Sequence, residues 1–239
     1  TANYCGRIRG DVLNLSALIC GNRFGRNLLI PGGVRFGIDG QRRDKLLKRL
    51  DDIEKDLNSA VPLMLETPSV TARFDGTGRL SSETAREIGL VGVAARACGL
   101  VLDVRDQMPY GAYRHNCPPA STYHSGDCFA RAYVRWLEIQ QSIVFIRHQL
   151  EISDSSQSFF KECSALKPEH LVVSMTEGWR GEICHAAATD ANGAFAFYKV
   201  TDPSFHNWFG LALALRNQQI SDFPLCNKSF SLSYCGHDL

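Results

Sequence analysis

The chain has 239 residues, of which 44% are hydrophobic and 21% charged, the composition of an ordinary globular protein with a sizeable core. Lys and Arg number 26 against 25 Asp and Glu, so the charge balance offers no electrostatic basis for binding nucleic acid or an anionic membrane. A membrane-spanning helix needs roughly 18 apolar residues. The best stretch, residues 90–104, is interrupted by Arg96 and Asp103. We therefore predict no nucleic-acid partner and no direct membrane span.

Nine cysteines are scattered along the chain, and no two of them form a C-x-x-C pair. An odd number at irregular spacing is unlike the disulfide framework of a secreted protein. We therefore expect mostly reduced, buried thiols in a cytosolic protein. The first residues carry neither a starting Met nor the basic and apolar segments of a signal peptide. We expect the chain to be the C-terminal part of a longer subunit.

The N-terminal part of the sequence indicates helices. Residues 11–20 carry a short helical stripe, and Pro31-Gly32-Gly33 predicts a turn. Residues 41–60 predict a strong amphipathic helix, which Pro62 ends or kinks. The apolar face of this helix consists of Leu46, Leu50, Ile53 and Leu57.

The next segment is more broken. Residues 67–78 predict a loop or a short strand. Ser81 with Thr84, or Ser82 ahead of Glu83, is a candidate cap for the helix that follows. Residues 84–99 indicate short helical pieces, because Gly89, Gly92 and Gly99 interrupt them. We expect irregular structure over residues 100–119.

The clearest periodicity lies in residues 127–150. Apolar residues recur three and four positions apart, the pattern of a long helix packed against another helix. The predicted stripe consists of Phe129, Ala132, Trp136, Ile139, Ile143, Ile146 and Leu150. Together with the helix over residues 41–60, it predicts a bundle core.

The pattern then changes from helical to extended. Residues 153–167 predict a loop with a helical turn, and residues 170–175 a strand. Residues 182–189 and 194–200 flank an Asn192-Gly193 pair, which is the strongest local hairpin signal.

Helices are expected again at the C-terminus. Ser204 is predicted to cap a helix through Arg216, and residues 221–224 begin a last helical turn or two. The residues that this helix is expected to bury are Trp208, Leu211, Ala212 and Leu215.

The predicted fold class is α+β: mostly helical, with a long-helix bundle core and a small antiparallel β-hairpin or sheet near the C-terminus. We expect a single domain over residues 1–239. Its parts are a helical bundle (1–150), a hairpin insertion (168–201) and C-terminal helices (202–239).

Motifs in order along almost the whole chain resemble one family, the large subunits shared by respiratory complex I (its quinone-side subunit) and the membrane-bound NiFe hydrogenases of the hydrogenase-4 and formate hydrogenlyase type. Two further stretches, Asp202-Pro203-Ser204-Phe205 and Asp222-Phe223-Pro224-Leu225, resemble the hydrogenase-like branch in particular. The segments that carry the family resemblance are residues 24–34 ending in Ile30-Pro31-Gly32-Gly33-Val34, residues 78–92, Asp103-x-Arg105 with Pro109-Tyr110 and Tyr113, Gly126-Asp127 with Arg131 and Arg135, and Glu177-Gly178-Trp179-Arg180-Gly181, where Trp179 stands in place of Pro.

The resemblance also implies what is missing. NiFe members hold their metal centre with two C-x-x-C pairs, because thiolates are soft ligands, and the C-terminal pair is expected just after residues 222–225. The aligned positions here are Ser233 and Gly236. Glycine cannot ligate and a Ser alkoxide is a poor substitute, so we expect no NiFe centre. A different site made of Cys226, Cys235 and His237 matches no standard zinc spacing.

Three residues are candidates for a catalytic role: Arg180, Glu177 and Asp222. In the hydrogenase branch the resembling arginine lies over the metal cluster, and an Arg followed by Gly places a permanent charge at a close backbone approach. The structural alternative is a buried ion pair of Arg180 with Glu177, Glu182 or Asp222. Asp222 itself is either a proton carrier or a helix N-cap.

The resemblance implies a redox subunit of a membrane-bound oxidoreductase, either a NADH:quinone oxidoreductase or a hydrogenase-like complex. The implied cofactors are a NiFe centre or quinone, with an iron–sulfur cluster on a partner subunit. In complex I the quinone is bound by a His and a Tyr that the resemblance places upstream of this chain. We expect the fragment itself to bind no cofactor and to be inactive alone.

The implied partners are an iron–sulfur small subunit and membrane subunits. They would hold the protein peripherally at the cytoplasmic side of the inner membrane. Two alternatives remain: a true NiFe-hydrogenase large subunit with unusual ligands, and a non-catalytic scaffold subunit.

Overall fold

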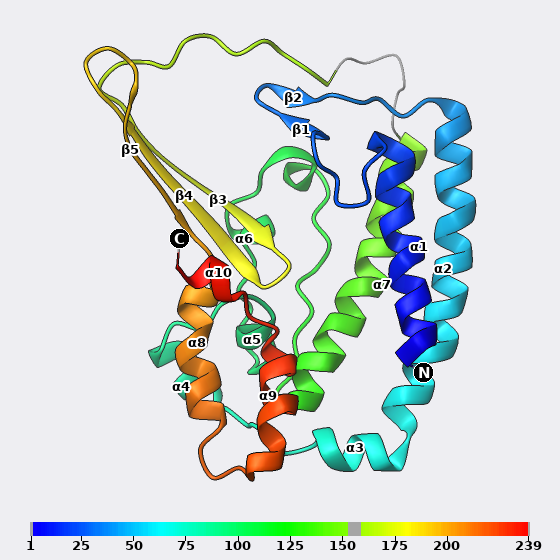
Figure 1. The fold of residues 1–239 in the computed structure, drawn as a ribbon. Coiled ribbons are helices and arrows are strands. Elements are labelled where there is room, and N and C mark those ends of the chain that lie inside the picture. The colour runs from blue at the N-terminus through cyan, green and yellow to red at the C-terminus, as the bar shows by residue number, and fades with distance from the viewer. Residues whose placement is uncertain (1, 153–158, 239) are drawn as a thin grey trace. The chain divides into compact units, whose positions relative to one another are not determined.

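The computed structural model describes residues 2–152 and 159–238 (Figure 1). The chain divides into two compact units, one comprising residues 1–67 and 142–165 and the other residues 68–141 and 166–239. Helices predominate, and a small antiparallel sheet lies near the C-terminus. The predicted α+β class is confirmed.

The first unit contains α1 (Ala2–Cys20), the short strands β1 (Leu29–Ile30) and β2 (Gly33–Val34), α2 (Gly40–Glu66) and the end of α7 (Cys128–Ile152). Helices α1 and α2 pack along each other (Figure 1). The predicted helix over residues 11–20 therefore begins earlier, at Ala2.

Helix α2 follows its predicted pattern. The Asp39 carboxylate caps it by accepting a hydrogen bond from the Arg42 amide at 2.8 Å. Three of the predicted apolar residues, Leu46, Leu50 and Ile53, are buried. Pro62 lies inside the helix and does not end it.

The turn at residues 31–33 is confirmed as the bend of a hairpin between β1 and β2. Gly33 has φ of +150°, and a Cβ there would lie 1.8 Å from the Phe159 carbonyl oxygen. Only glycine allows this approach of two backbone segments within the first unit.

The second unit begins with short helices: α3 (Pro68–Phe74), α4 (Ser82–Glu87), α5 (Gly92–Ala97), α6 (Val104–Gln107) and the 3₁₀ turn η1 (Gly111–Arg114). The prediction of a loop or strand over residues 67–78 was wrong, because residues 68–74 form the helix α3. Pro68 occupies the first helical position, where the N–H group that proline lacks would have no partner within the helix. The predicted cap is confirmed, because the Ser81 hydroxyl accepts from the Thr84 amide at 3.1 Å.

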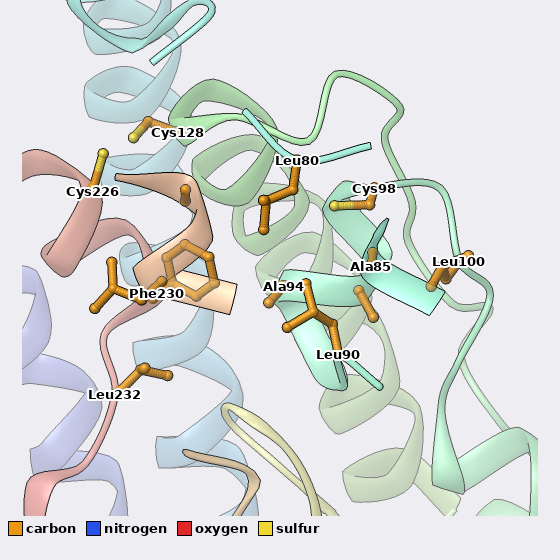
Figure 2. Packing of buried hydrophobic residues seen from close by; sticks show 13 residues of the cluster. Leu80, Ala85, Leu90, Ala94, Cys98, Leu100, Cys128, Cys226, Phe230 and Leu232 are labelled. Carbon is orange, nitrogen blue, oxygen red and sulfur yellow. The ribbon is translucent and has the colours of Figure 1, made fainter. Parts of the chain in front are cut away.

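The hydrophobic core of this unit joins α4, α5, α8 and α9 rather than two long helices. Leu90 and Phe230 are almost fully buried in this core (Figure 2). Ala95 of α5 and Leu211 of α8 belong to the same cluster. A second cluster packs α5 against the first half of α7.

Helix α7 has the predicted extent, but its buried face differs from the predicted stripe. Ile143 and Leu150 are buried as expected, whereas Ile139 and Ile146 are exposed. In the first half of the helix the most deeply buried side chains include Arg131. Arg131 occupies a core position because its guanidinium donates to the Gly78 and Gly126 carbonyls inside the protein.

The sheet contains β3 (Leu171–Gly178), β4 (Gly181–Thr189) and β5 (Phe195–Thr201), all antiparallel, in the order β3-β4-β5. The hairpin around residues 190–193 is confirmed, with a register irregularity between Ala188 and Thr189. A second tight turn, at Trp179 and Arg180, joins β3 to β4. Of the loop predicted over residues 153–167, residues 153–158 lie outside the described residues, and residues 161–167 contain no helix.

The chain ends with α8 (Pro203–Ala214), the 3₁₀ turn η2 (Ile220–Asp222), α9 (Phe223–Phe230) and α10 (Tyr234–His237). The cap predicted at Ser204 was wrong: Asp202 caps α8, accepting from the Ser204 amide at 2.8 Å, because Pro203 takes the first helical position. Ala212 is exposed, whereas Asn207 and Gly210 are buried, so the buried face of α8 is rotated relative to the predicted one.

Candidate functional site

The turn that carries Arg180 is held by a close backbone approach. Gly92 has φ of +62°, and a Cβ there would lie 2.2 Å from the Arg180 carbonyl oxygen. Gly181 approaches from the other side, where a Cβ would lie 2.9 Å from the Gly92 nitrogen. The Arg-Gly pair therefore stands at a close backbone approach, as its sequence predicts.

Asn207 of α8 ties this approach together. Its Oδ1 accepts from the Val91 amide at 3.1 Å, and its Nδ2 donates to the Val91 carbonyl at 3.2 Å and the Arg180 carbonyl at 3.4 Å. Asn207 is 1% exposed, so its amide is satisfied by protein alone. Sequence patterns did not reveal this residue, because a polar residue on a helical apolar face is recognised only once its partners are known.

The Arg180 side chain binds a backbone carbonyl of the C-terminal segment rather than a carboxylate. Its Nε donates to the Ser231 carbonyl, and its guanidinium lies 4.9 Å from the centre of the Trp179 ring. Within residues 2–152 and 159–238 Arg180 forms no ion pair. Of the acids named in the structural alternative, Glu177 pairs with Arg96 and Asp222 pairs with Arg73.

A second guanidinium lies over the same indole. Arg135 is 5.1 Å from the Trp179 ring centre, and it donates to the Arg131 and Ser229 carbonyls at 3.0 and 2.7 Å. Its remaining donor, Nε, is buried and has no partner among the described atoms. Burial, reinforced by the charges of Arg131 and Arg180, lowers the pKa of Arg135 to about 10.

Glu177, the second candidate, lies at the end of β3 in a buried ion cluster. Its carboxylate accepts from Arg96 at 2.9 Å and from the Val104 amide at 3.1 Å, and its side chain is 6% exposed. Arg96 also donates to Glu138 at 2.8 Å. Burial raises the pKa of Glu177 above its ordinary value even though the charge of Arg96 opposes this shift.

The cluster extends to Asp103, which lies 3.8 Å from Arg96 and pairs with Arg105 at 2.6 Å. Burial acts to raise the pKa of Asp103, but the hydrogen bonds and charge of Arg105 outweigh it, and the pKa is lowered. The sequence hinted at this cluster, because Arg96 and Asp103 interrupt an apolar run. A charge inside such a run signals a buried pair.

Asp222, the third candidate, lies in a different set of contacts. It pairs with Arg73 at 2.8 Å and accepts from the Gln219 amide at 3.1 Å. It therefore helps to cap η2, and its side chain does not cap α9. The structure thus brings Glu177 and Arg180 together on one hairpin, whereas the partners of Asp222 are Arg73 and the η2 turn.

Asp127 and Arg131 hold the start of α7 through hydrogen bonds to backbone groups. The Asp127 carboxylate accepts from the Ala130 amide at 2.8 Å and the Gly76 amide at 2.9 Å. Arg131 donates to the carbonyls of Gly78 and Gly126, each at 2.9 Å. These bonds fix the start of α7, which also carries Arg135.

The two positions aligned with metal ligands do not fit a NiFe centre. The Ser233 hydroxyl caps α10 by accepting from the Gly236 amide at 3.0 Å. A Cβ on Gly236 would lie 2.6 Å from the Asp202 carboxyl carbon, so a side chain has no room there. Cys235 lies 3.4 Å from the Ser233 hydroxyl and is exposed.

Over the described parts of the chain, no three His, Cys, Asp or Glu residues gather closely enough to hold a metal ion. Nor does any helix of those parts have the length and apolar character needed to cross a membrane. What the arrangement offers chemically is fixed positive charge beside an exposed indole, since Trp179 is 59% exposed. Such a surface stabilises negative charge placed against it.

Comparison with known proteins identifies relatives over most of the chain. Residues 1–162 match the family model described as the 49 kDa subunit of respiratory-chain NADH dehydrogenase. The chain is 32% identical over 212 residues to the carbon monoxide-induced hydrogenase of Rhodospirillum rubrum, covering 88% of this chain and 58% of the relative. It is 30% identical over 232 residues to a NADH-quinone oxidoreductase subunit of Thermosipho melanesiensis, covering 94% and 63%.

A third relative is hydrogenase-4 component G of Escherichia coli, 27% identical over 228 residues. This match covers 95% of the present chain but only 38% of the relative. The chain thus spans between 38% and 63% of the length of these three relatives.

Proposed function

The chain belongs to the family of the 49 kDa subunit of respiratory-chain NADH dehydrogenase, and we propose on that premise that it is a redox subunit of a membrane-bound complex related to complex I and the hydrogenases. The names of its relatives support this, since they are subunits of NADH-quinone oxidoreductase and hydrogenases. Within the complex it would assist electron transfer toward quinone or toward a proton/hydrogen couple.

The observation that carries the proposal is the pair of guanidiniums, Arg135 and Arg180, on one exposed indole, neither of which pairs with a carboxylate of the described residues. A reduced redox group gains negative charge, and a nearby fixed cation stabilises that charge without reorganisation. We therefore propose that the turn at Trp179 and Arg180 faces a redox group carried by a partner subunit. An iron–sulfur small subunit is the partner that the family resemblance favours.

Membrane subunits would be the remaining partners, and we propose peripheral attachment through them at the cytoplasmic side of the inner membrane. The redox chemistry would not use a NiFe centre on this chain. Ser233 caps a helix and Gly236 packs on Asp202, so neither position serves as a ligand. Arg180 then acts electrostatically, and Glu177 fixes the strand that precedes it.

Substitution of Arg180 in the purified complex tests the proposal. Arg180→Ala should reduce quinone- or proton-reducing activity at least tenfold, while size-exclusion chromatography still shows the assembled complex. Arg180→Lys, which keeps the charge, should restore part of the activity. Arg147→Ala, which alters a partly exposed arginine of the first unit, is the matched control. Wild-type activity in an assembled Arg180→Ala complex would contradict the electrostatic role and favour a scaffold.

The absence of a NiFe centre is tested separately. Nickel and iron are measured in the full-length subunit after separation from its partners. Neither metal should be present in stoichiometric amount. Stoichiometric nickel and iron would contradict this part of the proposal and favour a hydrogenase with unusual ligands.

A further inference from the structure

Two cysteines from distant parts of the sequence face each other in the core of the second unit. Cys128 is the first residue of α7 and is 1% exposed, while Cys226 lies in α9 and is 0% exposed. Their sulfur atoms point toward one another (Figure 2), and Cys128 is among the groups that raise the pKa of the Cys226 thiol. They are therefore a pair rather than two isolated thiols.

The surroundings hold this pair in place. Arg131 Nη2 lies 3.5 Å from the Cys128 sulfur. Gly78 closes the other side, since a Cβ there would lie 2.7 Å from the Cys226 sulfur. The thiols are packed against each other, so one sulfur is always within reach of the other, and that proximity favours bond formation.

We propose that Cys128 and Cys226 form a buried dithiol that oxidises to a disulfide joining α7 to α9. The S–S bond forms as two S–H bonds break, and the thiols lose two protons and two electrons. A small-molecule disulfide accepts them by two exchange steps and leaves as two thiols. The reverse exchange with excess thiol restores the dithiol.

The bond would act on the segment that the candidate site uses, although the proposal does not depend on the proposed function. Helix α9 ends at Ser229 and Phe230, whose carbonyls accept hydrogen bonds from Arg135. The Ser229 hydroxyl also accepts from Arg131 at 2.9 Å. A covalent link from Cys226 to the start of α7 would fix these acceptors against the arginines.

The dithiol should react slowly in the folded protein. Burial raises the pKa of Cys226 to about 11, with Cys128, Arg131 and Asp222 as the facing groups. Because only the thiolate is nucleophilic, little of Cys226 is reactive at neutral pH. The exposed cysteines, Cys5, Cys163 and Cys235, should be modified first.

The experiment treats the purified full-length protein with an excess of a small-molecule disulfide, blocks free thiols after denaturation and maps peptides by mass spectrometry. We expect a peptide pair that joins Cys128 to Cys226, lighter by two hydrogen atoms and lost after reduction. Cys128→Ser and Cys226→Ser should abolish it. Cys98→Ser is the matched control, because Cys98 is 2% exposed in the same core but has no thiol among the groups facing it.

Recovery of Cys128 and Cys226 as free thiols, after an incubation that continues until the peptide map no longer changes with time, would overturn the proposal. So would a bond from either of them to Cys98 instead. The wild-type peptide map alone decides between these outcomes if a Ser variant fails to fold.

Discussion

The arginines of the second unit fall into two groups, around Arg96 and around Arg135. Arg96 is 1% exposed and is surrounded by carboxylates of Glu138, Glu177 and Asp103. Among the described residues, Arg135 donates to backbone carbonyls alone and leaves one buried donor unused. The first group is closed in the sense that each of its arginines is paired with a carboxylate, whereas the second retains positive charge.

The difference between the two groups of arginines indicates which of them can act on a partner. A buried ion pair that is complete carries no net charge outward, so it stabilises structure at best. An arginine without a counter-ion keeps a desolvation cost that an external anion would relieve. The Arg135 and Arg180 side of the hairpin is therefore the side at which a partner's redox group has an electrostatic effect.

The largest expected effect comes from breaking the closed group. Arg96→Ala leaves the buried carboxylate of Glu177 and the partly buried one of Glu138 without their counter-ion, which should cost about 3–5 kcal/mol of unfolding free energy. Urea denaturation measures the loss. Arg86→Ala, an exposed arginine in the last turn of α4, is the control and should change stability by less than about 0.5 kcal/mol. A loss below about 1 kcal/mol for Arg96→Ala would contradict the closed-cluster interpretation.

Arg135→Met tests the open group and should cost less, about 1–3 kcal/mol. The carbonyls of Ser229 and Phe230 lose a donor, but no carboxylate is left unpaired, and an uncompensated charge is removed. The same denaturation series compares the two variants directly. A loss as large as that of Arg96→Ala would mean that Arg135 does have a compensating anion, and the contrast between the two groups would fail.

Sequence patterns predicted the elements of this fold better than its polar interior. The helix over residues 41–60, the long helix α7 and the hairpin around Asn192 and Gly193 follow from local periodicity and turn chemistry. Their signals lie within a few residues of one another. These elements therefore depend little on contacts with the rest of the chain.

The candidate site was only partly predictable. Arg180 was identified from its motif, and its close backbone approach follows from the glycine beside it. Asn207 and Arg135 were not predicted as site residues, because the partners of each lie far away in sequence. Asn207 and Val91, for example, are separated by 116 residues. The predicted face of α7 failed for the same reason, since buried Arg131 replaces an apolar residue there.

Protonation of Glu177 gives a test inside the closed group. The pKa of Glu177 in the folded protein lies above the unfolded value of 4.5. The stability that Glu177 contributes is therefore fully present below pH 4.5, and it is lost as the pH rises through the folded pKa. Asp103, whose pKa is lowered, contributes the opposite trend. The stability of the wild type minus that of Glu177→Gln should therefore fall as pH rises from about 4 toward 7. A difference that rises over this range would contradict the raised pKa.

The smallest effect is expected in the first unit, where ion pairs lie at the surface. Arg147 pairs with Asp51 at 2.8 Å and with Glu54 at 2.6 Å, but Asp51 is 64% exposed and water screens the charges. Arg147→Ala should therefore cost at most about 1 kcal/mol, and less at high salt. Denaturation at low and high ionic strength measures both. If Arg147→Ala costs as much as Arg96→Ala, burial is not what separates these arginines, and the argument that places function at the uncompensated pair loses its basis.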